Sequence, residues 1–196
     1  ERGKGASSGH YTGYANEGAD GRVTLEWIGA QWWCDGNVGT FGASALGMAQ
    51  YALSPGAPRV LKCMVPIVGT ADFYHDAVYQ GGALRYALTH GWLDGHDAAD
   101  VFEQLKIHRL WDAWWEGFAV LPKVGTVNVP ALHVGGWFDI FLQGTLDAFT
   151  SFQHRGGPGA VGRQKVIIGP WTHYGTFQNS AGQLTYPATA MFVTDS

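Results

Sequence analysis

The sequence predicts an α/β fold in which a mainly parallel sheet carries a helical insertion. Short apolar runs of strand character alternate with stretches of helical spacing, as expected of strands joined by crossover helices. Between residues 73 and 126 the strand-like runs disappear, and helical spacing rich in aromatic residues replaces them. With 196 residues, 46% of them hydrophobic, the chain is long enough to bury one sizeable core.

The elements can be placed in order from their boundary residues. Asp20 can cap a first helix, and the turn residues Gly36 and Asn37 return the chain into a strand. Pro55 and Gly56 end the helix that follows this strand. The expected elements are a loop over residues 1–18, a helix over 20–32, a strand from 38, a helix over 48–53, strands over 62–68 and 129–134, a helix over 143–154 and a strand over 165–173.

The insertion is predicted to be helical between residues 97 and 118, with a heavily aromatic face. Val101, Leu105, Trp114 and Trp115 follow helical spacing there. Most of these side chains are expected to be core. A helical insertion between strands often covers the carboxyl ends of a sheet as a lid, so some of the aromatic residues could line a substrate pocket.

Composition and charge restrict the partners of the chain. The net charge is −4 and the 12 Lys and Arg residues are scattered, so no nucleic-acid partner is expected. No run is apolar for long enough to span a membrane. The eight histidines and two cysteines show no metal-ligand spacing, so no metal or other cofactor is predicted. Cys34 and Cys63 are interpreted as free thiols, which favours a cytoplasmic localisation. No targeting segment fixes the localisation, and the sequence does not indicate the oligomeric state.

Residues 38–47, V-G-T-F-G-A-S-A-L-G, predict a strand, a sharp turn and the start of a helix, with Ser44 at the turn. A serine in this position projects its hydroxyl beyond the carboxyl end of the strand, and small neighbours are needed because bulky ones would clash. The pattern is G-x-S-x-x-G, in which Gly47 lies one position later than in the nucleophile elbow G-x-S-x-G. The alternative is an ordinary glycine-rich turn in which Ser44 caps the helix.

Ser44, Asp139 and His173 each follow directly on a strand-like run. The carboxyl ends of parallel strands lie on one side of a sheet, so these residues are expected to converge there. A serine nucleophile needs a histidine base and an acid that holds the base in the right tautomer, and the order Ser, Asp, His is that of α/β-hydrolases. Asp72 is a rival acid, and Asp139 could instead cap a helix. His133 lies inside a strand and is interpreted as a core histidine.

Five blocks of sequence support a more specific assignment. They are R-G-K-G-A-S-S-G at residues 2–9, W-C-D-G-N-V-G at 33–39, A-D-F-Y at 71–74 with G-G-A at 81–83, G-G-W-F-D at 135–139 and I-G-P-W-T-H at 168–173. In this order they resemble the CocE/NonD hydrolases, the cocaine esterase and X-Pro dipeptidyl-peptidase group of serine hydrolases. The resemblance covers nearly the whole chain.

The resemblance implies a serine hydrolase that cleaves small-molecule carboxylic esters or related acyl compounds through an acyl-enzyme, without a cofactor. Ser44 would be the nucleophile, Asp139 the acid and His173 the base, and the Ala45 N–H would be one oxyanion donor. Family members usually have tyrosine where this chain has Ala45. The alternatives are an X-Pro dipeptidyl-peptidase, an α-amino-acid ester or β-lactam acylase, or a non-catalytic truncated hydrolase module. The substrate pocket is expected to be lined by Trp137, Phe141, Trp171 and Tyr79.

The resemblance also implies how the chain is divided. Residues 1–72 and 127–175 would form the hydrolase core, 73–126 the helical lid and 176–196 an irregular link towards an absent jelly-roll domain. The second oxyanion donor of the family is a tyrosine hydroxyl upstream of the region that this sequence covers. The chain is therefore expected to be an internal fragment of a larger enzyme, with its amino-terminal strands missing.

Overall fold

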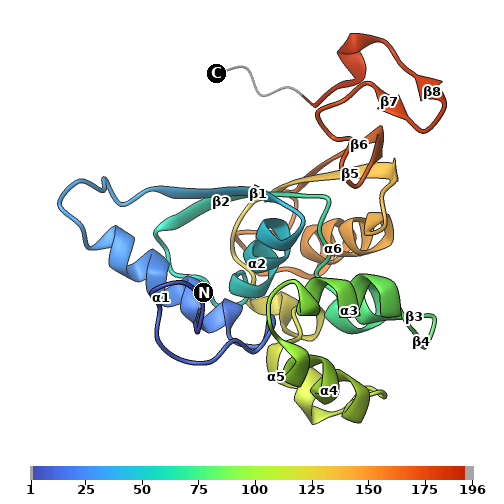
Figure 1. Cartoon of the computed structure of the whole chain (residues 1–196). Coiled ribbons are helices and arrows are strands. Elements are labelled where there is room, and N and C mark those ends of the chain that lie inside the picture. The colour runs from blue at the N-terminus through green and yellow to red at the C-terminus, as the bar shows by residue number, and fades with distance from the viewer. Residues whose placement is uncertain (1, 193–196) are drawn as a thin grey trace.

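The computed structural model describes residues 2–192 and is built around a parallel sheet of four strands (Figure 1). The strands lie in the order β1-β2-β5-β6, and every neighbouring pair is parallel. Because each strand runs in the same direction, all four carboxyl ends lie at one edge of the sheet. The strands are β1 (Val38–Ala43), β2 (Leu61–Ile67), β5 (Leu132–Phe138) and β6 (Lys165–Thr172).

Three helices lie together against one face of this sheet (Figure 1). They are α1 (Glu17–Gly29), α2 (Ala45–Leu53) and α6 (Leu142–Arg155). Helix α2 packs on both β1 and β2, and α6 packs on β5. Within residues 2–192, no helix combines the length and the apolar character that crossing a lipid bilayer requires.

The insertion between β2 and β5 folds as a group of short helices on the far side of α2 and α6 from the sheet (Figure 1). In chain order it comprises the π-helix η1 (Phe73–Val78), strands β3 (Tyr79–Gln80) and β4 (Ala83–Leu84), helices α3 (Tyr86–Asp94), α4 (Ala99–Ile107) and α5 (Ala113–Phe118) and the 3-10 helix η2 (Leu121–Thr126). After β6 the chain forms the small hairpin β7 (Ser180–Ala181) and β8 (Leu184–Thr185) and the 3-10 helix η3 (Ala188–Ala190).

The structure corrects three boundaries. The first helix begins at Glu17 and not at Asp20, whose carboxylate accepts a hydrogen bond from Arg2 Nε at 2.6 Å and caps nothing. Residues 97–118 form two helices because Asp112 starts a new one by accepting a hydrogen bond from the Trp114 N–H at 3.0 Å. Residues 176–196, which were predicted to be irregular, contain β7, β8 and η3, and residues 193–196 lie outside the described part of the chain.

A polar network holds the core between α2 and the sheet. His133 is fully buried on β5, and its Nδ1 lies 2.8 Å from Tyr51 Oη. Its Nε2 lies 3.1 Å from Gln164 Oε1, which can only accept, so Nε2 carries the proton and Nδ1 accepts from the tyrosine. Both ring nitrogens are therefore satisfied with a neutral ring, which confirms the interpretation of His133 as a core histidine.

This network should make folding stability depend on pH. Burial lowers the pKa of His133 from 6.5 to about 4. The unfolded chain therefore binds more protons than the folded one between these values, and the stabilisation present above pH 6.5 is lost as the pH falls towards 4. The expected loss is about 3 kcal/mol. Urea unfolding measures the free energy of unfolding of the wild type and of His133→Gln. The difference between the two free energies should become smaller as the pH falls from 6.5 towards 4.

Exposed His154 on α6 provides the control for this measurement. The variant His154→Gln leaves the network of His133, Tyr51 and Gln164 intact, so its free energy of unfolding should fall with pH by about as much as that of the wild type. A difference between wild type and His133→Gln that stays constant from pH 7 to pH 4 would contradict the assignment of a neutral buried ring.

Candidate active site

Ser44 lies at a strained turn between β1 and α2. Its backbone angles, φ 56° and ψ −119°, are ones that side-chain-bearing residues rarely adopt. A Cβ on Gly42 would lie 2.5 Å from the Leu46 Cβ, which something would have to move to accommodate, and one on Gly47 would lie 3.0 Å from the Ile67 carbonyl oxygen, which is a tight contact with the backbone. The Ser44 side chain makes no capping hydrogen bond to α2, which excludes the alternative of a helix-capping serine.

The three side chains expected to converge do meet. His173 Nε2 lies 2.8 Å from Ser44 Oγ, and His173 Nδ1 lies 2.7 Å from Asp139 Oδ1. A carboxylate can only accept, so Nδ1 carries the proton and Nε2 is free to accept from the serine hydroxyl. Asp139 and His173 each follow the end of a strand, β5 and β6, which is why residues far apart in sequence share one edge of the sheet.

Burial is uneven across this group. The Asp139 side chain is completely buried and that of His173 is 10% exposed. The second carboxylate oxygen of Asp139, Oδ2, is also buried and has no hydrogen-bond partner among residues 2–192. Among the described residues, the side-chain carboxylate of Asp139 therefore accepts its hydrogen bond from His173.

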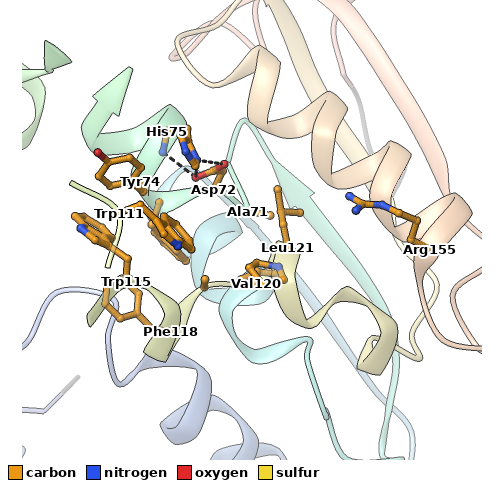
Figure 2. Close-up of a pocket in the computed structure, with 13 residues that line it drawn as sticks. Ala71, Asp72, Tyr74, His75, Trp111, Trp115, Phe118, Val120, Leu121 and Arg155 are labelled. Carbon is orange, nitrogen blue, oxygen red and sulfur yellow. Dashed lines mark hydrogen bonds and ion pairs between the residues drawn. The ribbon is translucent and has the colours of Figure 1, made fainter. Parts of the chain in front are cut away.

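Asp72, the rival acid, lies elsewhere. Its carboxylate accepts a hydrogen bond from the His75 N–H at 2.8 Å and lies 2.9 Å from His75 Nδ1. The pair lines a separate pocket of about 290 Å³, together with Trp111, whose ring stacks on His75 (Figure 2). The His75 side chain is 63% exposed and that of Asp72 is 18% exposed. In the part of the chain that the structure describes, the His173 ring hydrogen-bonds to Ser44 and Asp139 and not to Asp72.

A cavity of about 420 Å³ opens beside Ser44 and His173. Its wall is almost entirely apolar, and none of the described residues that line it carries a carboxylate. Ala45, the first residue of α2, belongs to this wall, and its N–H has no intrahelical acceptor because it lies in the first turn. The aromatic residues of the wall are Tyr11, Tyr14, Phe73, Trp92, Trp114, Trp115, Phe118, Phe141 and Tyr174.

Of the four residues predicted to line the pocket, the structure places only Phe141 there, with its ring centroid 5.4 Å from that of His173. Trp171 is buried against Phe192, and its indole N–H donates to the Ala190 carbonyl at 2.6 Å. Tyr79 is a core residue whose hydroxyl donates to the Leu105 carbonyl at 2.7 Å. Trp137 is 62% exposed on β5. These three placements correct the prediction.

The amino-terminal segment contributes to the cavity wall, although its sequence did not predict this. Tyr11 and Tyr14 lie in the stretch that was expected to be only loop, yet both line the cavity, and Tyr11 is 7% exposed. Tyr14 stacks on Phe73 of the insertion, with ring centroids 4.9 Å apart. The sequence around these two tyrosines is rich in glycine and has neither helical nor strand periodicity. Their place in the cavity wall is therefore visible only from their contacts in the folded structure.

The parallel strand order and the places of Ser44, Asp139 and His173 at the strand ends are those of an α/β-hydrolase. Comparison with known proteins narrows this class. The sequence matches the family described as X-Pro dipeptidyl-peptidase (S15 family) over residues 1–101 and 92–175. The chain therefore belongs to this family.

The similar proteins are longer than this chain. Cocaine esterase of Rhodococcus sp. (strain MB1 Bresler) is 29% identical over 88% of the chain, which spans 37% of that enzyme. A putative serine esterase of Mycobacterium tuberculosis is 28% identical over 81% of the chain and 27% of its own length. A CocE/NonD family hydrolase from Staphylococcus aureus has a TM-score of 0.75 at 24% identity, over 88% of this chain and 32% of that one. An α-amino acid ester hydrolase gives the same TM-score at 19% identity, over 96% and 39%.

Proposed function

We propose that the protein is a serine hydrolase that cleaves carboxylic esters through an acyl-enzyme intermediate. The observation that carries this proposal is the pair of hydrogen bonds that joins Ser44, His173 and Asp139. A serine hydroxyl becomes an effective nucleophile when a neutral imidazole can take its proton, and the tautomer required for this is the one that Asp139 imposes.

In the acylation step, Ser44 Oγ attacks the ester carbonyl carbon while its proton moves to His173 Nε2. The carboxylate of Asp139 stabilises the imidazolium that forms. The Ala45 N–H, at the start of α2, donates a hydrogen bond to the oxyanion. His173 then gives the proton to the departing alcohol oxygen. In the second half, a water loses a proton to His173 and attacks the acyl carbon, and Ser44 leaves with that proton as the acid is released.

The apolar cavity supports a substrate with an apolar acyl or alcohol group. The insertion supplies much of its wall, including Leu88 from α3, Leu105 from α4 and Trp114 from α5. Residues 73–126 thus act as a lid over a core formed by 1–72 and 127–175, and the segment after residue 175 is a link outside this core. Closing such a lid over the ester excludes water and strengthens the electrostatic interactions at Ser44.

An X-Pro dipeptidyl-peptidase activity is the second candidate, because the matching family carries that name. A peptidase of this kind, like an α-amino-acid ester acylase, must bind the ammonium group of its substrate. A buried ammonium requires a carboxylate or several carbonyl acceptors. The described lining of the cavity offers no carboxylate, which favours a neutral ester over both alternatives.

The proposal predicts that a fluorophosphonate probe labels the protein at Ser44, because the activated hydroxyl displaces fluoride from phosphorus. Peptide mapping by mass spectrometry identifies the modified residue. The same preparation should hydrolyse p-nitrophenyl butyrate and leave alanyl-prolyl-p-nitroanilide intact. The labelling rate of the His173→Gln variant should be lower by a factor of about a hundred or more, since this variant lacks the base.

Each part of this experiment can fail separately. Labelling at another serine, or equal labelling of the wild type and His173→Gln, would contradict the proposed nucleophile and base. Labelling at Ser44 with cleavage of the anilide and none of the ester would replace esterase by peptidase activity. No labelling at all would favour the non-catalytic module.

A further inference from the structure

Arg85 connects the insertion to the turn that carries Asp139. The residue is half-buried and lies directly before α3. Its Nη1 donates to the backbone carbonyl of Asp76 at 2.7 Å and to that of Ile140 at 3.3 Å. The first acceptor belongs to η1, and the second follows Asp139 in the chain. One guanidinium nitrogen therefore bridges two segments that are far apart in sequence.

The same guanidinium packs on the aromatic ring beside His173. Arg85 Cζ lies 5.5 Å from the centroid of the Phe141 ring, within range of a cation–π interaction. The Phe141 ring meets the His173 ring at 5.4 Å, with an interplanar angle of 79°. Phe141 is only 4% exposed, so its ring has little freedom to move. Arg85 thus contacts both residues that follow Asp139.

Asp76 adds a second contact between η1 and the segment that follows this turn. Asp76 is 5% exposed, and its carboxyl lies against Gly144 in the first turn of α6, where a Cβ would overlap both Asp76 and Thr70. Burial raises the pKa of Asp76 to about 6, and the nearby Arg85 charge acts in the opposite direction. The positive end of α6, against which this carboxyl lies, favours its ionised form.

We propose that Arg85 is a positioning residue that holds the turn at 139–141, so that Asp139 and Phe141 keep His173 aligned with Ser44. Arg85 does not line the cavity beside Ser44, so it acts through the turn and not by touching the substrate. A misplacement of about 1 Å in a reacting group can cost about a hundredfold in rate, and a turn released on one side permits such a shift. This inference rests on the proposed esterase function.

The test compares Arg85→Met with Arg85→Lys in the hydrolysis of p-nitrophenyl butyrate. Methionine keeps the length and apolar stem but cannot donate, so kcat should fall about tenfold or more while KM changes less than about twofold. Lysine retains a donor and a charge and should restore part of kcat. Arg155→Met is the matched control and should behave as the wild type, because Arg155 lies at the far end of α6 from this turn, where its Nη2 donates to Ser151 Oγ at 2.7 Å.

Hydrogen exchange gives a readout that needs no catalysis. The Leu142 N–H donates to the Asp139 carbonyl at 3.3 Å, and the peptide that contains this turn should exchange faster in Arg85→Met than in the wild type or Arg155→Met. Unchanged kcat together with unchanged exchange in Arg85→Met would overturn the inference, as would a fall in kcat without faster exchange of this peptide. Faster exchange in Arg85→Met, in a protein whose wild type cleaves no ester, would support the role of Arg85 in the turn and contradict only the proposed function.

Discussion

The Ser44→Ala variant should lose ester hydrolysis, with kcat falling on the order of 10⁶-fold, while the fold is retained. In the proposed mechanism the Ser44 hydroxyl forms the acyl-enzyme, and alanine fits the same space among the small residues around it. Stopped assays with p-nitrophenyl butyrate measure kcat. Far-UV circular dichroism and the unfolding temperature report on the fold, and both should match the wild type.

Ser54→Ala is the matched control for this variant. Ser54 lies at the other end of α2, and its hydroxyl donates to the Tyr51 carbonyl at 2.8 Å. Its removal should cost at most about 1 kcal/mol of stability and leave kcat unchanged. Retention of more than a small fraction of wild-type activity by Ser44→Ala would show that another residue is the nucleophile.

The Asp139→Asn variant should lower kcat about 10⁴-fold at neutral pH. The amide keeps the shape of the side chain but has no charge, so it no longer stabilises an imidazolium and no longer requires the proton to be on Nδ1 of His173. The interaction that the variant loses is a short one, because His173 Nδ1 lies 2.7 Å from Asp139 Oδ1. The measurement is kcat for p-nitrophenyl butyrate at neutral pH and across a range of pH.

Asp72→Asn makes this prediction decisive between the two candidate acids. Asp72 also pairs with a histidine, but with the exposed His75 at the pocket in Figure 2. Its neutralisation should change kcat by less than about threefold. Equal losses in the two variants, or a larger loss in Asp72→Asn, would transfer the role of the acid to Asp72.

The strands and the elbow could be predicted because local patterns specify them. The apolar runs that form β2 and β6 are bounded by turn residues. The residues around Ser44 are small because larger side chains would clash, as a Cβ on Gly42 would with Leu46. Once these strands are parallel, residues at their carboxyl ends must share one edge of the sheet. The meeting of Ser44, Asp139 and His173 therefore follows from topology, and their catalytic roles stay a prediction.

The pocket could not be predicted in the same way. Trp171 and Tyr79 were expected at the substrate and are buried in other contacts, whereas Tyr11 and Tyr14 come from a stretch without any pattern. A strand or helix repeats with a fixed period, so a sequence shows which side chains share a face. It does not show which distant element that face will meet.

By itself, therefore, the sequence determined the class of fold, the elbow at Ser44 and the three side chains at the strand ends, because each depends on local spacing and on strand direction. Only the tertiary structure decided that Asp72 pairs with His75, that the cavity wall is free of carboxylates among its described residues, and that Arg85 reaches Ile140. These features depend on how the insertion packs against the core, and that packing is a sum of many long-range contacts that no short stretch of residues encodes.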